Sequence, residues 1–435
     1  MLSPARNSDV LRQPGVLALM IAQALGAFNH NALRGAILSL VAFRGLALPG
    51  LGAEEMVGIS TIAIVAPYVL LSILAGLFAD RWPKAIVVQS VKGAEIAFFA
   101  LAAIGLWLGD AHLLLLSLVL AGIGAALLGP AKFGMLPELV DDAQLLGANA
   151  LINASALLAI LAGMIFGSAC VLAQNGPLIV ALGCVVLALV GWLTSLFLPR
   201  QDAADPTSPL DPGRVMASHV SAFRLLTAKP GLILAATGAS WFWFQAAFST
   251  SLFPVYAAQG RFRGEELTSL LFLVSTLGAV AGALACRRVL IRARSLRVFS
   301  IWVSGLIAVP ALAFWWGGPP SHLEGMALVL ISLAASSLGT GLFIVPLVWQ
   351  MQAQAEPRHR ARIIGATHVL NGLAMIASGL VIILLGKAGI SVSTMLLMIM
   401  GSTALVASLV LPGSMPPTPS IDGVSTWRSW RFRRR

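Results

Sequence analysis

Four polar side chains interrupt the first long apolar segment, in the stretch GAFNHNALRGAIL at positions 26–38. They are Asn29, His30, Asn31 and Arg34. A guanidinium offers two parallel donors that match a phosphate, while amide and imidazole groups can bond further oxygens or water. His30 and Arg34 are four residues apart and so share one face of a helix. We predict that this face binds a phosphate or a similar anion, with Arg34 as its ligand. The alternative is that Arg34 extends to the outer membrane surface and only anchors the helix.

A second pair of charges, Lys92 and Glu95, lies in another apolar segment. Their spacing of three residues also places them on one helix face. Burying such groups in lipid costs at least about 2.5–3.5 kcal/mol each, so they should face a cavity or each other. We predict that they contribute to the same site. The alternative is an ion pair that neutralises itself within one helix and has only a structural role.

The composition predicts the kind of element that holds these residues. The chain has 435 residues, of which 58% are hydrophobic and only 10% charged, and its mean hydropathy is +0.91. A soluble domain carries about 25% charged residues, so this composition predicts a polytopic membrane protein. The first apolar run, 15–43, is too long for the apolar region of a signal peptide, and we expect it to be retained as a helix.

Twelve segments are long enough to cross about 30 Å of hydrocarbon as helices. We expect them at 15–43, 56–79, 85–107, 112–129, 144–173, 177–198, 231–258, 267–286, 298–317, 325–350, 362–386 and 391–412. Pro130 and Pro346 are expected to end the fourth and tenth segments. Apart from Arg362, which begins the eleventh segment, Arg34, Lys92 and Glu95 are then the whole Lys, Arg, Asp and Glu content of the spans.

The distribution of Lys and Arg predicts the orientation. If both termini are cytoplasmic, 22 of the 28 Lys and Arg residues fall in cytoplasmic segments and 4 in the opposite loops. The remaining 2 are Arg34 and Lys92. The positive-inside rule therefore favours cytoplasmic termini. It also explains the net charge of +11 without a nucleic-acid partner. The tail TWRSWRFRRR (426–435) is expected to lie on anionic headgroups.

The chain divides into two halves of six spans. A polar segment rich in Pro, Asp and Ser separates them, with a short surface helix expected at 219–227. We predict an N-terminal bundle at 1–198, a cytoplasmic linker at 199–230, a C-terminal bundle at 231–412 and a basic tail at 413–435. GANALIN (147–153) and GATHVLN (365–371) open the fifth and eleventh spans, which suggests a duplicated unit.

The loop GLFADRWPK (76–84) follows the second span on the cytoplasmic side. It is similar to the Gly-x-x-x-Asp-Arg loop signature of the major facilitator superfamily, whose transporters are built from parallel six-helix halves. Gly76 permits close helix approach, and Asp80 can face helix N-termini or an arginine of the other half. We therefore predict a gate formed by Gly76, Asp80, Arg81 and Lys84. The alternative is an ordinary basic loop that holds the topology.

Three longer strings carry a closer resemblance. GAFNHNALRGA, ADRWPKAIVVQSVKGAEI and GPAKFGMLPELVDDAQLLGANALINAS resemble the lysophospholipid transporter family of bacterial inner membranes. The resemblance is good over the N-terminal half and weak over the C-terminal half. It implies movement of lysophospholipid, mainly lysophosphatidylethanolamine or lysophosphatidylglycerol, to the cytoplasmic leaflet for reacylation. Family members stand alone or are fused to an acyltransferase and an acyl-carrier-protein synthetase. The family pattern has Asp-Asn where this chain has His30-Asn31, and a histidine cannot supply the permanent anion of an aspartate.

The seventh span carries the aromatic stretch SWFWFQAAF (240–248). If it faces the polar stretch of the first span, Trp241 would contact an acyl chain and Gln245 a headgroup. The alternative is that these aromatics only pack or face lipid. The predicted substrate site is therefore formed by Asn29, His30, Asn31, Arg34, Lys92, Glu95, Trp241 and Gln245.

Enzyme motifs are absent from the sequence. No histidine is followed five residues later by aspartate, as a membrane acyltransferase would require, and there is no nucleotide-binding phosphate loop or nucleophile elbow. Cys170, Cys184 and Cys286 show no paired spacing, so neither a disulfide framework nor a metal site is expected. No cofactor is predicted.

Taken together, these features predict an all-α membrane protein with twelve transmembrane helices in two six-helix bundles, the major facilitator fold. The predicted function is flipping of lysophospholipid by alternating access, in a monomer that works beside a separate acyltransferase. Two alternatives stay open. One is an exporter of another amphiphile or drug-like solute, and the other is a non-transporting scaffold for an acyltransferase.

The orientation can be tested with reporter fusions. Alkaline phosphatase is active only outside the cytoplasm, so a fusion after Asp211 should be inactive and one after Gly109 active. Activity at Asp211 would reverse the predicted orientation of every span.

Overall fold

The computed structural model describes residues 13–200, 202, 212–260, 262–293, 295–354 and 360–414. Within these ranges the chain is helical and contains no strand. The first half consists of α2 (Pro14–Arg44), α3 (Ala53–Arg81), α4 (Lys84–Leu108), α5 (Ala111–Leu139), α6 (Asp142–Cys170) and α7 (Gly176–Ser195). After α8 (Pro212–Thr227) come α9 (Pro230–Gln259), α10 (Gly264–Ala293), α11 (Leu296–Gly317), α12 (Leu323–Gln354), α13 (Arg360–Lys387) and α14 (Val392–Ser414).

Twelve of the described helices are long and apolar enough to cross a membrane, which confirms the predicted fold class. The remaining one, α8, covers the short helix expected in the linker. Neighbouring spans run in opposite directions, so the molecule has two ends. We call the end at which α2 begins and α14 ends the terminal end, and the end at which α2 ends and α3 begins the distal end.

Two helices are longer than the sequence indicates. We expected Pro130 and Pro346 to end the fourth and tenth spans, and this was wrong: both lie inside helices, which continue to Leu139 in α5 and Gln354 in α12. Prolines are tolerated within transmembrane helices because neighbouring helices and side chains re-satisfy the backbone groups that they free. The longer α5 brings a further cation, Lys132, into a helix of the bundle.

Local sequence explains several helix boundaries. The α5 helix begins after Asp110, whose carboxylate accepts hydrogen bonds from the backbone N–H groups of His112 and Leu113. The Leu113 bond and the His112 bond hold the pKa of Asp110 below its usual value. Gly45 and Gly109 follow α2 and α4 in the left-handed conformation that glycine adopts without strain.

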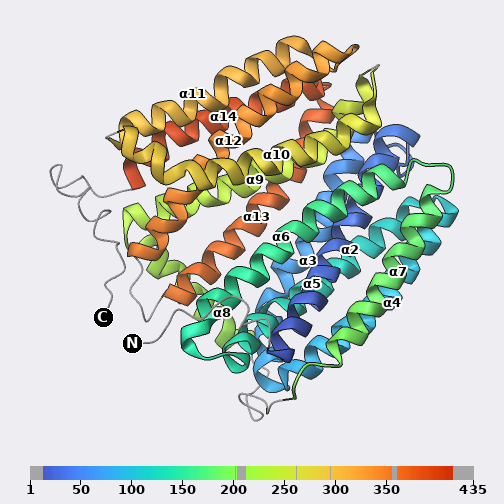
Figure 1. Cartoon of the computed structure of the whole chain (residues 1–435), viewed down its shortest axis with the longest axis vertical. Helices are drawn as coiled ribbons and strands as arrows, with labels where there is room; N and C mark the ends of the chain where they lie inside the picture. Colours follow the sequence, from blue (N-terminus) through green and yellow to red (C-terminus); the bar gives the residue numbers. More distant parts are fainter. Residues whose placement is uncertain are drawn as a thin grey trace.

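The two halves pair their helices in the same way (Figure 1). In the first half α2 packs on α6, α3 on α5, and α4 on both α5 and α7. In the second half the equivalent pairs are α9 with α13, α10 with α12, and α11 with α12 and α14. This repeated pattern supports a duplicated six-helix unit. In Figure 1 the blue-to-green helices α2–α5 and α7 lie on one side, and α10–α12 and α14 on the other.

The bundles meet along a seam. Across it α3 packs on α13, α6 on α10, and α2 and α3 on α9. The α3–α13 contact is very close at Gly58 and Gly379. A methyl group on Gly58 would lie 2.6 Å from the carbonyl oxygen of Gly379, and one on Gly379 would lie 2.7 Å from that of Gly58. Gly58 is five residues from the start of α3, so this crossing lies near the distal end.

The linker helix α8 connects the bundles at the terminal end. It contacts the end of the seam formed by α3 and α13, and also α9. Lys229, just after α8, donates to the carbonyl oxygen of Gln354 at the end of α12. The segment between the bundles is therefore attached to both of them.

The seam glycines predict a stability contrast. In helices alanine is favoured over glycine by roughly 0.5–1 kcal/mol, so Gly305→Ala, at an exposed site with open space around the new methyl group, should stabilise slightly. Gly58→Ala places the same methyl group against a backbone carbonyl and should destabilise by about 1–3 kcal/mol. Thermal unfolding of the purified protein in detergent measures both. Equal shifts of the same sign would show that the α3–α13 crossing is not tightly packed.

Candidate functional site

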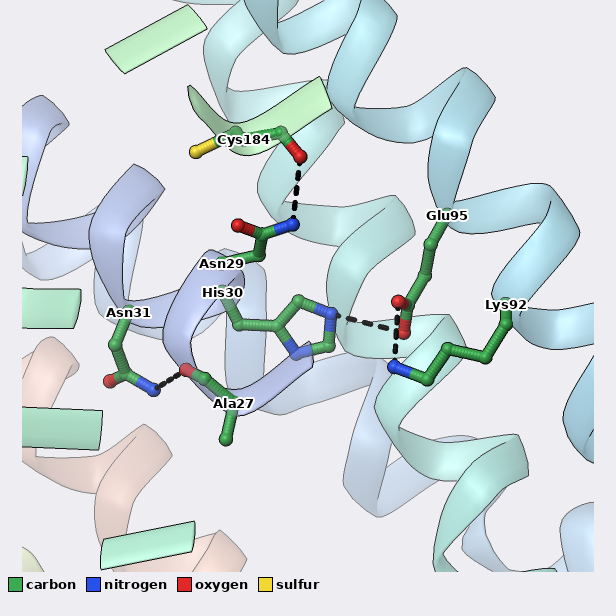
Figure 2. A network of polar contacts seen from close by, with 7 residues as sticks. All are labelled: Ala27, Asn29, His30, Asn31, Lys92, Glu95 and Cys184. Atoms are coloured by element: carbon green, nitrogen blue, oxygen red, sulfur yellow. Dashed lines mark hydrogen bonds and ion pairs between the residues drawn. The ribbon is translucent and has the colours of Figure 1, made fainter. Parts of the chain in front are cut away.

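A buried group of three ionisable side chains connects α2 to α4 (Figure 2). The ammonium nitrogen of Lys92 lies 2.8 Å from Glu95 Oε2, and His30 Nε2 lies 3.5 Å from Glu95 Oε1. Lys92 and Glu95 are each only 1% exposed, and the His30 side chain 12%. We call these residues the charged triad. The pair expected within α4 is present, and His30 joins it from α2.

Small and aromatic neighbours hold the triad in place. Gly26 lies where a methyl group would come within 2.2 Å of the Lys92 ammonium, so a side chain here would displace Lys92. The His30 ring stacks on Phe99, with ring centroids 5.8 Å apart. Lys92 and Glu95 compensate each other's charge, which greatly lowers the cost of burial in lipid. The triad therefore carries a net positive charge only when His30 is protonated.

The two asparagines beside His30 point in different directions (Figure 2). Asn29 is fully buried and donates to the carbonyl oxygen of Cys184 on α7. Asn31 donates to the carbonyl oxygen of Ala27 in its own helix. The Asn29 hydrogen bond joins α2 to α7. Asn31 is only partly buried, and its amide oxygen stays available for another partner. A role for either in substrate binding stays a prediction.

Arg34 lies one turn further along α2 and contacts the other bundle. Its Nη2 atom donates to Ser251 Oγ of α9 at 2.7 Å, and Ser251 Oγ lies 2.8 Å from Thr61 Oγ1 of α3. Arg34 is 9% exposed, and Thr61 and Ser251 are fully buried. Each of the three is eight to ten residues from the distal end of its helix. We call these residues the seam cluster.

The seam cluster bears on the surface-anchor alternative for Arg34. A side chain that extended to the membrane surface would be exposed and would end at the headgroup level. Arg34 is instead buried between the bundles and donates to Ser251. The surface-anchor alternative is therefore not supported. The side chains of His30 and Arg34 project from the same helix, but in this conformation they have separate partners.

In the second half, the α9 aromatics form a stack along the helix. Trp241 lies 5.1 Å from Phe244, and Phe244 lies 6.0 Å from Phe248, between ring centroids. Trp241 donates to Thr403 of α14, and Gln245 donates to Ser249. Both Trp241 and Gln245 are half-buried. The packing interpretation accounts for the Trp241 contact, and a role in binding an acyl chain stays a prediction.

Gly76, Asp80 and Arg81 lie in the last six residues of α3, and Lys84 begins α4. The expected loop 76–84 is therefore helical as far as Arg81, and only Trp82 and Pro83 separate the two helices. The Arg81 guanidinium lies 5.7 Å from the ring centroid of Trp82. Lys84 forms an ion pair with Glu138 at the end of α5, at 2.5 Å. Lys84 thus joins helices of the same bundle. The side-chain surroundings of Gly76 and Asp80 lie outside the described part of the structure.

Sequence reasoning missed Lys132, Thr61 and Ser251. Lys132 lies outside the predicted spans because Pro130 is expected to end the fourth, although it belongs to one of the strings that carry the family resemblance. It is half-buried in α5. Thr61 and Ser251 are ordinary residues of apolar spans, and only the fold brings them to Arg34. No group of three or more His, Cys, Asp or Glu within the described ranges could hold a metal.

Comparison with known proteins agrees with this architecture. The sequence profile of the Major Facilitator Superfamily matches residues 15–379. The chain belongs to this superfamily.

Named relatives and solved structures of the superfamily are similar to the chain. Lysophospholipid transporter LplT of Yersinia pestis (strain Pestoides F) is 28% identical over 359 residues, which cover 80% of this chain and 82% of the relative. LplT of Yersinia pseudotuberculosis serotype O:3 shows the same values. The nucleoside transporter NupG superposes with a TM-score of 0.68 at 16% identity over 92% of this chain and all of its own. A bacterial homolog of the human lysosomal transporter Spinster superposes with a TM-score of 0.64 at 15% identity, over 95% of this chain and 97% of its own.

The charged triad predicts that mutations of Lys92 and Glu95 have non-additive effects on stability. Glu95→Leu leaves Lys92 buried without its carboxylate, which should cost about 3–5 kcal/mol of unfolding free energy. Lys92→Leu/Glu95→Leu removes both charges and should recover most of that loss. Thermal unfolding in detergent measures the cycle. Glu266→Gln breaks the exposed pair with Arg263 and is the matched control, with little expected change. A double variant as unstable as Glu95→Leu would contradict a mainly structural pair.

Proposed function

We propose that this protein transports lysophospholipids across the bacterial inner membrane by alternating access of its two bundles. The similarity to LplT over 80% of the chain supports the substrate class, and the twelve-helix superfamily fold supports the mechanism. The observation that carries the proposal is Arg34, a buried cation at the seam that lacks a carboxylate partner among the described residues. A phosphate that enters between the bundles would supply the missing anion.

The polar residues form a path along α2. Arg34 lies in the distal third of the helix, and His30 is about 6 Å nearer the terminal end at 1.5 Å per residue. With cytoplasmic termini the distal end is external, so a headgroup from the outer leaflet would meet Arg34 first. It would then reach His30, Asn31, Lys92 and Glu95 near the middle of the membrane, with Asn29 supporting the α2–α7 packing behind them. Trp241 and Gln245 of α9 would line the opposing half, where the aromatic stack would suit an acyl chain.

The terminal end is proposed to act as the cytoplasmic gate, formed by Gly76, Asp80, Arg81 and Lys84. The linker helix α8 contacts both α3 and α13 there, so movement of the bundles must also move α8. We propose that the protein works as a monomer and delivers its substrate to a separate acyltransferase. With the predicted cytoplasmic termini, delivery would occur on the cytoplasmic side, where the proposed acyltransferase would act.

The transport proposal is tested in liposomes. Purified protein should move fluorescent lysophosphatidylethanolamine or lysophosphatidylglycerol between leaflets, measured as the fraction protected from a quencher that cannot cross the membrane. Vesicles with the same lipid and no protein set the background. A rate equal to that background for every lysolipid would contradict transport and leave the scaffold alternative. Flipping of a cationic amphiphile in place of lysolipids would favour the exporter alternative.

The gate proposal is tested at Asp80. Asp80→Asn keeps the size of the side chain and removes its charge, so it should reduce lysolipid flipping at least about tenfold if the charge holds the gate through a helix terminus or an arginine. Membrane insertion and thermal stability should be unchanged. Asp110→Asn removes an acid from an exposed loop at the distal end and serves as the control. An unaltered flipping rate in Asp80→Asn would show that the loop serves topology only.

A further inference from the structure

We propose that Arg34 is a latch on the external seam that exchanges Ser251 for the phosphate of the incoming lysophospholipid. In the closed seam Arg34 donates to Ser251. When the seam opens, the same guanidinium becomes the first binding site for the headgroup. This inference rests on the proposed function for the identity of the ligand, whereas the latch itself depends only on the seam.

The first support is the incomplete bonding of Arg34. The guanidinium carries five N–H donors. In the structure its Nη2 atom bonds Ser251, and its buried Nε atom has no hydrogen-bond partner. The buried lysines Lys84 and Lys92, in contrast, each have a carboxylate. A buried charge with one neutral acceptor is costly, so the closed seam satisfies Arg34 only in part.

The second support is the position of the acceptor. Ser251 belongs to α9 of the second bundle, while Arg34 and Thr61 belong to α2 and α3 of the first. Both polar contacts of the Ser251 hydroxyl therefore cross the seam. When the bundles separate at this end, both contacts break together and Arg34 has no acceptor from α9. Opening thus creates a cation that faces a gap between the bundles.

The third support is the competition that follows. A phosphate accepts two parallel, charge-assisted hydrogen bonds from a guanidinium, which a serine hydroxyl cannot match. Phosphate and Ser251 bind the same donors in different conformations of the seam. A ligand that binds one of two conformations shifts the equilibrium toward it by its differential affinity. The headgroup therefore favours the open seam, and Ser251 lowers the apparent affinity for the headgroup by the fraction of protein held closed.

This competition predicts opposite effects for the two partners of one hydrogen bond. Ser251→Ala should loosen the seam and strengthen lysolipid binding, by about twofold to tenfold. Arg34→Gln should also loosen the seam but weaken binding about ten- to a hundredfold, since it removes a charge-assisted contact. Arg34→Lys should fall between, because an ammonium acts as a point charge. Thr61→Val removes a hydroxyl from the same cluster and leaves Arg34 intact.

The experiment measures seam opening and binding separately in a background without native cysteines. Ile62, which faces Gly379 across the seam, is replaced by cysteine and labelled from outside with a maleimide that cannot cross the membrane. Binding of lysophosphatidylglycerol is titrated in detergent, and acyl-free glycerophosphoglycerol is titrated in parallel. We expect both Ser251→Ala and Arg34→Gln to increase labelling at least about threefold, with opposite changes in lysolipid affinity. Thr61→Val should increase labelling without weakening binding.

Each outcome decides a different part of the inference. Parent-like lysolipid binding by Arg34→Gln, or weakened binding by Ser251→Ala, would overturn the exchange. Labelling unchanged in both variants would overturn the latch. If the acyl-free diester binds as tightly as the lysolipid, the ligand is a soluble phosphate and the lipid assignment is wrong. If the parent protein binds no lysolipid while labelling still responds to Arg34→Gln, the proposed function fails and the latch stands.

Discussion

The structure depends on one constraint: lipid offers no hydrogen-bond partner to a charge, so each ionisable side chain within the spans needs its partner inside the protein. Lys92 satisfies this constraint through its ion pair with Glu95 in the same helix, and His30 adds a contact from α2. Arg34 satisfies it in part by donating a hydrogen bond to Ser251 of the other bundle. The first solution can stay intact while the bundles move, because α2 and α4 belong to one bundle. The second must break when the seam at the distal end opens.

The duplicated architecture determines where such a break can occur. Corresponding helices pair in the same way within each half, so each bundle is held together by its own helix pairs. Between them, close contact depends on small residues such as Gly58 and Gly379, whose backbones touch. Packing between small residues gives tight van der Waals contact with few side chains to disentangle. A seam of this kind can separate with the bundles unchanged, which suits rigid-body motion of each half.

Much of the fold could be predicted because a segment that spans hydrocarbon must be long and apolar, which can be read from local composition. Twelve apolar segments follow from it directly. The linker helix was predicted from its own polar segment, and the pairing of Lys92 with Glu95 from their i, i+3 spacing. The predictions that failed concerned Pro130 and Pro346, where tertiary neighbours override a local helix-breaking preference. Partners across helices, such as Ser251 for Arg34 and Cys184 for Asn29, could not be predicted. They depend on how helices distant in sequence are rotated against each other, and a single hydroxyl in an apolar span carries no signal of it.

The charge distribution between the bundles explains why the seam uses a hydroxyl and not a carboxylate. Among the described residues, every buried Lys, Arg, Asp or Glu lies in the first half: Arg34, Lys84, Lys92 and Glu95. The second half presents neutral groups to the seam, such as Ser251. A carboxylate at that position would form an ion pair with Arg34, and separating a buried pair leaves two uncompensated charges at a cost of several kcal/mol. A neutral acceptor holds the seam less strongly and leaves only one charge to be satisfied. A phosphate arriving in the gap satisfies that charge, whereas it would be repelled by a carboxylate on the facing helix.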